Sequence, residues 1–157
     1  MVRLASHDDG PAIARLRRAW TEENAGEPIA DDAFEARFEA WFERESKQRL
    51  TWLAFVDGSD GPVGMLTMLV YDRMPFPRSP GSSRPEQWGY VGNSFVLASH
   101  RNTGLGEQLL SACTSHADDH GFARLVLGPS ERSVPFYARA GFEPATSLMV
   151  RAGRTGV

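Results

Sequence analysis

One segment limits the folds open to this chain, a glycine-rich turn that joins a strand-like run to a helix-like run. Residues 90–97 read YVGNSFVL and favour a strand, and residues 105–120 carry apolar residues at helical spacing. Between them lies the segment Arg101-Asn102-Thr103-Gly104-Leu105-Gly106. Glycines at such a turn let the backbone approach a ligand, and free N–H groups at a helix start attract phosphate. The unit therefore predicts a phosphate-bearing ligand held between a strand and a helix.

The rest of the chain alternates strand and helix patterns that fit one mixed sheet. Further strands are predicted at residues 2–5, 50–56, 63–71, 124–127 and 147–151. Further helices are predicted after Asp8 or Asp9, after Asp31 and Asp32, and over residues 131–140, where Pro135 predicts a late or irregular start. No linker or repeat divides the chain. We therefore expect an α/β fold of the mixed, α+β type in one domain over residues 1–157.

Two segments between these elements could bear on function. Phe34, Phe38, Trp41 and Phe42 form an aromatic stripe at helical spacing, which is typical of core packing, although part of it could wall a substrate pocket. Residues 72–88 contain four prolines and cannot form regular structure. Long loops in compact domains are uncommon and tend to be functional or disordered, so this one is either a surface loop or a substrate-side lid.

Composition excludes several classes of protein. A net charge of −3 gives no case for a nucleic-acid partner. The single cysteine, Cys113, excludes an intrachain disulfide and a cysteine zinc cluster, and it falls on an apolar helix face where a buried inert thiol is expected. Of the four histidines only His116 and His120 have a spacing that metal ligands use, and with Asp118 and Asp119 between them they are more typical of a solvated helix end, so no metal is expected. Without an apolar run long enough for a signal peptide or a membrane span, we expect a cytoplasmic protein with no membrane partner.

Charge is distributed unevenly along the chain. Residues 20–45 hold nine acidic residues against two arginines, whereas residues 121–157 hold five arginines against two acidic residues. Charge runs usually belong to solvated helix faces. The alternative is functional: the acidic segment would form the side of a site that binds the acceptor, and the basic segment the side that binds the cofactor.

Two common phosphate-binding motifs fit the turn poorly. A P-loop ends in Gly-Lys-Ser/Thr, but this chain has Gly106-Glu107-Gln108. The dinucleotide fingerprint needs a third small residue where Leu109 stands.

A resemblance to a protein family indicates which phosphate-bearing ligand the glycine turn would bind. Residues 93–110, NSFVLASHRNTGLGEQLL, resemble the acetyl-CoA binding motif of the GNAT N-acetyltransferase superfamily. Residues 130–142, SERSVPFYARAGF, look like its second motif, a Tyr followed four residues later by Gly-Phe. The resemblance covers residues 90–142 in sequence and the whole chain in element order. It implies the GNAT-like acyltransferase fold, a mostly antiparallel central sheet with a splayed strand pair, flanked by about four helices.

The resemblance also implies roles for individual residues. By position, the backbone of Phe95 and Val96 would pair with the pantetheine arm, and Ser130 would touch it. The backbone N–H of Ser94 falls where the superfamily holds the acetyl carbonyl, Asn93 would hold the acceptor or a water, and Tyr137 is the general acid. The pyrophosphate would lie on the glycine turn, formed by Arg101, Asn102, Thr103, Gly104, Leu105, Gly106 and Glu107.

The implied activity is acetyl transfer from acetyl-CoA to a primary amine through a direct ternary complex. The acidic first third suggests an amine-bearing small molecule, such as an amino acid or an aminoglycoside-like compound, or a peptide amine. The general base stays open among Glu22, Glu23, Glu27 and a water chain, because the strand before the turn has no carboxylate. Alternatives are a non-catalytic acyl-CoA binding or sensing module and, on weaker ground, a protein-interaction domain that uses the proline-rich loop. The superfamily often dimerises, which leaves a homodimer open.

Overall fold

The computed structural model describes residues 1–77, 79–81 and 85–151 of the chain. Within them, five strands form one sheet in the order β1-β2-β3-β4-β5. Antiparallel pairing links β1 through β4 in succession, and only β4 and β5 are parallel. The mostly antiparallel sheet that the family resemblance implies is therefore confirmed. Its strands are β1 (Val2–Leu4), β2 (Arg49–Ala54), β3 (Gly64–Asp72), β4 (Gln87–Val96) and β5 (Leu125–Leu127).

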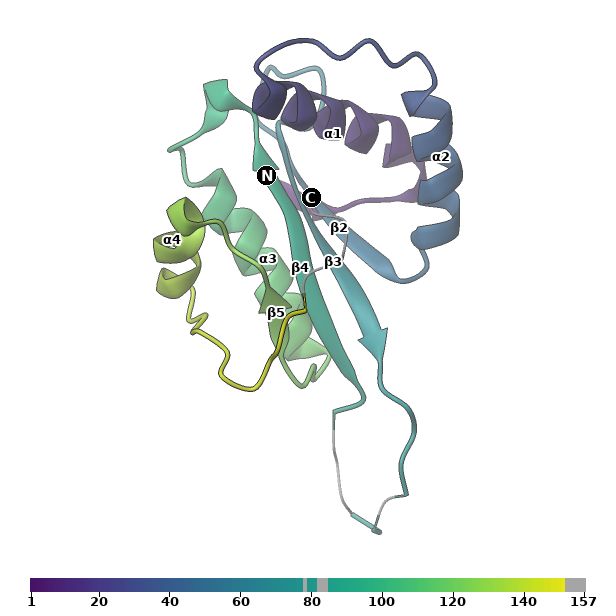
Figure 1. Ribbon diagram of the computed structural model, residues 1–157, viewed down its shortest axis with the longest axis vertical. Coiled ribbons are helices and arrows are strands. Elements are labelled where there is room, and N and C mark those ends of the chain that lie inside the picture. The colour runs from purple at the N-terminus through teal and green to yellow at the C-terminus, as the bar shows by residue number, and fades with distance from the viewer. Residues whose placement is uncertain (78, 82–84, 152–157) are drawn as a thin grey trace.

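Helices cover both faces of this sheet. Figure 1 shows α1 and α2 on one face, α3 on the other, and α4 beyond β5. Among the described helices, none is long and apolar enough to cross a bilayer. As predicted, the last helix starts irregularly: a 3₁₀ turn precedes it, and Pro135 falls in its first turn, where a missing N–H is tolerated. The helices are α1 (Gly10–Ala25), α2 (Phe34–Glu45), α3 (Leu105–Asp119) and α4 (Val134–Arg139).

The core is split by the sheet into two clusters, because successive strand residues point to opposite faces. Trp52 and Leu66 pack with Leu109 of α3 in one cluster. Leu53 and Met65, each one residue away in sequence, pack with Ile13 of α1 in the other. The sheet is thus packed between α1 on one face and α3 on the other. The end of β4 lies between these two helix layers.

The strand predicted at residues 147–151 is absent, so that prediction is wrong. Met149 is 99% exposed and Val150 is 96% exposed. Apolar, β-branched side chains favour a strand only where they pack against neighbouring strands. Among the described residues no strand pairs with this segment, and it stays irregular.

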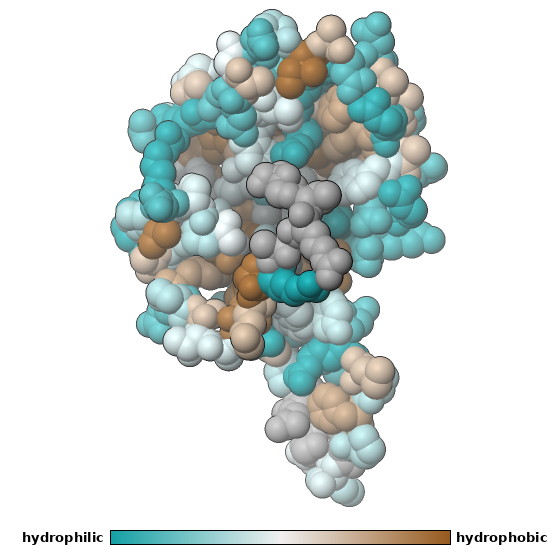
Figure 2. Space-filling model, viewed as in Figure 1, coloured by the Kyte–Doolittle hydropathy of each residue, from teal (hydrophilic) through white to brown (hydrophobic). Residues whose placement is uncertain are grey.

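The proline-rich segment forms an arm between β3 and β4. Arg73 donates its N–H to the carbonyl of Glu86 at 2.8 Å, which continues the hairpin past the strand ends. Figures 1 and 2 show the arm projecting from the body of the molecule. None of its described residues lines either of the two pockets described below. The position of these described residues favours the surface loop over the substrate-side lid.

Candidate active site

The strand pair next to the glycine turn is splayed, as predicted. The register between β4 and β5 ends at Val91 opposite Leu127. β4 continues to Val96, and no strand in the described part of the chain pairs with it on that side. Residues 92–96 therefore form an open sheet edge, which can pair with an extended ligand.

A β-bulge redirects the middle of β4. Gly92 pairs with Thr67 and Phe95 pairs with Met65, so two residues of β4, Asn93 and Ser94, lie opposite a single residue of β3. Asn93 has a φ of 49°, in the left-handed region that Asn tolerates better than most residues. Its side chain lines both of the pockets at this site. The bulge is therefore the local device that brings Asn93 and Ser94 into the site.

The backbone of Val96, and not that of Phe95, faces the open edge. Leu97 donates its N–H to the carbonyl of Val63 at 2.9 Å, which makes Val96 a non-hydrogen-bonded position opposite β3. By alternation the N–H and C=O of Phe95 point to β3. Phe95 and Val96 are both predicted to pair with the pantetheine arm. In this register only Val96 has its backbone groups at the open edge. The Phe95 ring instead stacks on Trp20 of α1, with ring centroids 5.9 Å apart.

A cleft of about 740 Å³ runs along this open edge. It is walled by the end of α1, by β4, by the turn after β5 and by α4. Of the residues predicted for the site, those that line it are Asn93, Ser94, Phe95, Val96, Arg101, Ser130 and Tyr137. Side chains that sequence reasoning did not identify also line it, among them Trp20, Asn24, Arg49 and Arg132. Trp20, Asn24 and Arg49 lie outside both motifs, and Arg132 lies within the second motif at a position to which the resemblance assigns no role.

The glycine turn leaves backbone donors free at the start of α3. Gly104 is the N-cap residue with a φ of 82°, and no side chain caps the helix. The first N–H groups of α3 have no intrahelical acceptor. A Cβ atom at Gly106 would make only an ordinary contact, 3.6 Å from Phe136 Cε2, so packing does not demand glycine there. Free donors and an unfilled backbone surface suit a diphosphate.

Arg101 connects the turn to α1. Its Nη2 lies 2.7 Å from both carboxylate oxygens of Glu23, and its Nε donates to the carbonyl of Val96 at 2.9 Å. The guanidinium is thus already neutralised by a carboxylate while it lines the cleft. The predicted phosphate contact would have to share this arginine with Glu23.

Tyr137 lies on the opposite wall of the cleft from α1. Its ring packs edge-on against Phe136 and Phe142, with centroids 5.0 Å and 5.8 Å away. Burial raises the pKa of the phenol above its usual value of 10.0, and a hydrogen bond with the Ser94 side chain partly offsets this. The phenol therefore keeps its proton at neutral pH and reaches the β4 bulge. Two residues from separate motifs, Ser94 and Tyr137, come together here.

The fold gives different surroundings to the three carboxylates considered as a general base. Glu22 lies 3.7 Å from Arg18 and accepts the N–H of Ile29. Glu27 is exposed and lines neither pocket. Glu23 lines the cleft, but Arg101 holds it.

A second, smaller pocket of about 260 Å³ adjoins the cleft under α2. Arg49, Thr67 and Asn93 line both. The aromatic stripe, predicted as mainly core with part of it as a possible pocket wall, does both: Phe38 and Phe42 pack against the core cluster of α1, while the whole stripe lines this pocket and α2 has no fully buried residue. Helical spacing identifies a shared face but not how completely a neighbouring layer covers it. The lining aromatic side chains are Phe34, Phe38, Trp41 and Phe42.

The acidic residues of the first third mostly face solvent. Figure 2 shows hydrophilic side chains over the outer face of α2. Asp31 pairs with Arg37 at 2.6 Å, and Glu35 pairs with Arg18 at 2.9 Å. Of the acidic residues at 20–45, only Glu23 lines the cleft and only Glu45 lines the smaller pocket. This arrangement fits solvated helix faces and not an acidic acceptor side.

Cys113 is buried on α3, as its position on the apolar face predicts. Burial raises the pKa of its thiol to about 12, so the nucleophilic thiolate is suppressed. Within the described ranges, no three His, Cys, Asp or Glu side chains come together in a group that could hold a metal ion.

Comparison with known proteins agrees with this geometry. The profile of the acetyltransferase (GNAT) family matches residues 13–142. A GCN5-related N-acetyltransferase from Ralstonia eutropha JMP134 superposes with a TM-score of 0.71 at 25% identity, over 97% of each chain. No curated protein matches the sequence significantly.

Two more distant crystal structures share the fold. A predicted acetyltransferase from Clostridium acetobutylicum, crystallised with acetyl-CoA, has a TM-score of 0.71 at 16% identity, over 97% of this chain and 95% of its own. Glucosamine-6-phosphate N-acetyltransferase from Arabidopsis thaliana has a TM-score of 0.70 at 15% identity, over 97% of each chain. With the profile match over most of its length, this chain belongs to the acetyltransferase (GNAT) family.

Proposed function

We propose that this protein transfers the acetyl group of acetyl-CoA to a primary amine through a direct ternary complex. The observation that carries the proposal is the cleft of about 740 Å³, which joins the open edge of β4 to Tyr137 and meets a second pocket at Asn93. A donor in the cleft and an acceptor in the pocket would meet at the β4 bulge. Family membership and the related structure crystallised with acetyl-CoA support this choice of donor.

The residues of the cleft suit the parts of acetyl-CoA. The free N–H groups at the start of α3 are donors for the diphosphate. At the open edge of β4 the N–H of Val96 is available to the pantetheine arm, while the Val96 carbonyl already accepts a hydrogen bond from Arg101 Nε. The half-buried position of Ser94 suits a donor to the acetyl oxygen, where charge develops during the reaction.

The proposed reaction is a direct transfer. The neutral amine nitrogen attacks the acetyl carbonyl carbon, a C–N bond forms and the C–S bond breaks. Tyr137 gives its proton to the departing thiolate, whose basicity lies near that of a phenol in model compounds. The amine nitrogen loses its proton to water, because the one candidate carboxylate in the cleft, Glu23, is held by Arg101. The phenol regains its proton from solvent, which leaves N-acetylamine and CoA.

The test combines calorimetry with an assay of thiol release. Acetyl-CoA is expected to bind with a dissociation constant below about 1 mM, within the usual range of enzyme substrates. Thiol release is expected with at least one member of a panel of primary amines: an alkylamine, a polyamine, amino acids, an aminoglycoside and a short peptide. Absence of acetyl-CoA binding would remove the proposal.

The pairing of Glu23 with Arg101 favours one alternative, a non-catalytic acyl-CoA binding module, because it leaves the cleft without a free base. That alternative predicts acetyl-CoA binding without acetylation of any amine in the panel. The two outcomes are separated by mass spectrometry of the products.

A further inference from the structure

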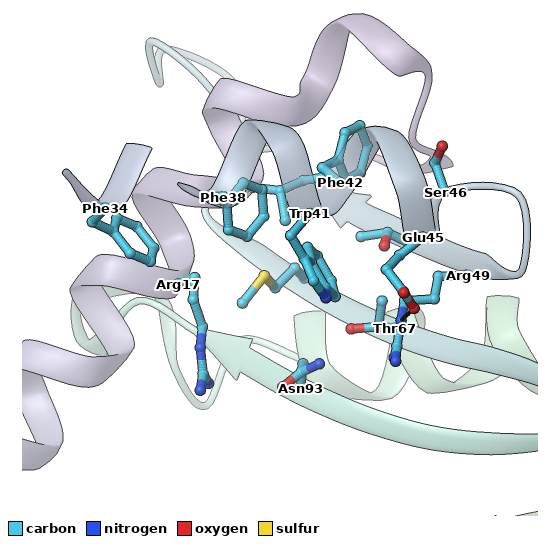
Figure 3. Close-up of a pocket in the computed structure, with 13 residues that line it drawn as sticks. Arg17, Phe34, Phe38, Trp41, Phe42, Glu45, Ser46, Arg49, Thr67 and Asn93 are labelled. Carbon is cyan, nitrogen blue, oxygen red and sulfur yellow. Dashed lines mark hydrogen bonds and ion pairs between the residues drawn. The ribbon is translucent and has the colours of Figure 1, made fainter. Parts of the chain in front are cut away.

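The pocket under α2 has the properties of an acceptor site for one apolar group. Its volume of about 260 Å³ is below the ~300–1,000 Å³ of pockets for drug-sized ligands. Phe34, Phe38, Trp41 and Phe42 form its α2 side, while Thr67 and Asn93 contribute from the sheet (Figure 3). A polymer segment or a sugar ring rich in hydroxyls would find few polar partners among these rings. The pocket therefore selects a compact, apolar substituent.

Two arginines also line this pocket. Arg17 lies with its guanidinium carbon 4.7 Å from the ring centre of Trp20, and no carboxylate in the described residues pairs with it. Arg49 is fixed by Glu45, whose Oε2 accepts from its Nε at 3.1 Å, and by the Trp41 ring at 5.3 Å. In the described part of the chain no acceptor takes the terminal nitrogens of Arg49. In Figure 3 both guanidinium groups extend to the edge of the pocket where Asn93 lies, away from the rings of Phe38 and Phe42.

The charges around the pocket favour an anionic group on the acceptor. Two guanidinium groups face one carboxylate, Glu45, which leaves an excess of one positive charge. Such a site repels a simple alkylammonium ion, and Arg binds carboxylates through parallel N–H donors. Because Arg49 lines both the pocket and the cleft, a carboxylate on it would lie next to the place where donor and acceptor meet.

We propose that the acceptor is an α-amino acid with an apolar side chain. This rests on the proposed acetyl transfer and adds the substrate class. The side chain occupies the pocket under α2, the carboxylate binds Arg49 and Arg17, and the α-amine lies at Asn93, facing the acetyl group in the cleft. The three groups on one carbon match the apolar, cationic and reactive parts of the site.

The same arrangement compensates for the missing base. Loss of a proton from the α-ammonium group leaves an acceptor with one net negative charge, which matches the excess positive charge of the site. Nearby positive charges favour the deprotonated form of an amine. The site therefore favours the form of the amino acid that attacks the acetyl carbon.

The test compares ligands that differ only in the carboxylate. In the thiol-release assay, L-phenylalanine and L-leucine are expected to have kcat/KM at least about tenfold above phenethylamine, isoamylamine and L-phenylalaninamide, the loss typical of removing one partner from a partly desolvated charge pair. Arg49→Gln and Arg17→Gln are expected to remove this preference. Arg15→Gln is the matched control, because Arg15 lies on the same helix, is exposed and lines neither pocket.

Calorimetry of L-phenylalanine with the CoA-saturated protein gives a second readout that does not need turnover. Binding is expected in the unmodified protein and in Arg15→Gln, and a loss of about tenfold or more in Arg49→Gln. Equal use of phenethylamine and L-phenylalanine would overturn the inference and leave acetyl transfer standing. Acetyl-CoA binding without acetylation of any amine would overturn the proposed function instead. Absence of L-phenylalanine binding to the CoA complex would overturn the amino-acid acceptor in either case.

Discussion

Replacing Tyr137 by Phe removes the proposed proton donor and little else. The phenol is half-buried, its ring packs against Phe136 and Phe142, and its hydroxyl interacts with Ser94. The Tyr137→Phe variant keeps the ring and loses one hydrogen bond, which costs about 1 kcal/mol of stability. The fold and the cleft are therefore expected to survive the change.

The effect on catalysis is expected to be larger than the effect on stability. A positioned general acid contributes about 10²–10⁴-fold to rate, or about 3–5 kcal/mol of barrier. The loss should appear in kcat, because protonation of the thiolate occurs only after acetyl-CoA has bound. The dissociation constant of acetyl-CoA, measured by calorimetry, should stay within about threefold of that of the unmodified protein.

The pH dependence of kcat is a second test of Tyr137 as the general acid. Because burial raises the pKa of Tyr137 above its usual 10.0, the acid stays protonated through neutral and mildly alkaline pH. The decline of kcat that reports loss of this acid is therefore expected only above about pH 10. It should be missing from the residual activity of Tyr137→Phe.

The matched control is Tyr71→Phe. Tyr71 is 51% exposed, packs with its ring tilted against Trp88 near the arm, and lines neither pocket. Its variant should keep full activity. If Tyr137→Phe kept kcat within about threefold while Tyr71→Phe behaved as expected, the general-acid role would be refuted.

Three further predictions concern stability. Asp9 accepts hydrogen bonds from Arg3 at 2.7 and 2.8 Å, and this pairing lowers the pKa of the carboxyl group. Asp9→Asn should therefore lose about 1.5–3 kcal/mol near pH 7 in urea unfolding, with the difference fading as pH falls below about 4. Burial raises the pKa of Cys113 from 9.0 to about 12, so this thiol stabilises the fold below pH 9 and the contribution, at most about 4 kcal/mol, is lost as pH rises toward 12. Cys113→Ala should flatten the alkaline fall in melting temperature. Gly89→Ala would drive a Cβ into Met68 Sδ and should cost about 1–3 kcal/mol.

Each of the three stability predictions would be contradicted by a specific result. A pH-independent difference for Asp9→Asn would show that the carboxylate charge is not what stabilises the N-terminal turn. An unchanged alkaline slope in Cys113→Ala would remove the thiol as its cause. For glycine, the control is Gly92→Ala, whose nearest contact would be an ordinary 3.4 Å to the Tyr90 ring. Equal stability of the two glycine variants would contradict the steric argument.

The parts of the site that follow from local patterns could be predicted from the sequence. The glycine turn has its own geometry, and Gly104 adopts the positive φ that the turn requires. Tyr137 and Ser94 come from two motifs, and the fold brings them together across the cleft. The turn depends on residue type and spacing within a few residues, which a single sequence displays, whereas Ser94 and Tyr137 are identified through the resemblance of their motifs to those of a known family.

Features that depend on distant neighbours could not be predicted. Residues 147–151 have the composition of a strand, but no described strand pairs with them. The aromatic stripe of α2 has helical periodicity, which does not show that it lines a pocket as well as packing against the core. Arg17 and Arg49 come from different elements, and nothing local relates one to the other. The pairing of Glu23 with Arg101 joins residues 78 positions apart. In each case tertiary packing, not local propensity, decides the environment.

A crystal structure of the protein with CoA and L-phenylalanine tests the central claim most directly. The account predicts the diphosphate on the N–H groups at the start of α3, the pantetheine arm along β4 at Val96, and the thiol between Ser94 and Tyr137. It also predicts the carboxylate of L-phenylalanine on Arg49. A CoA molecule bound away from the open edge of β4, or a thiol remote from Tyr137, would contradict the account.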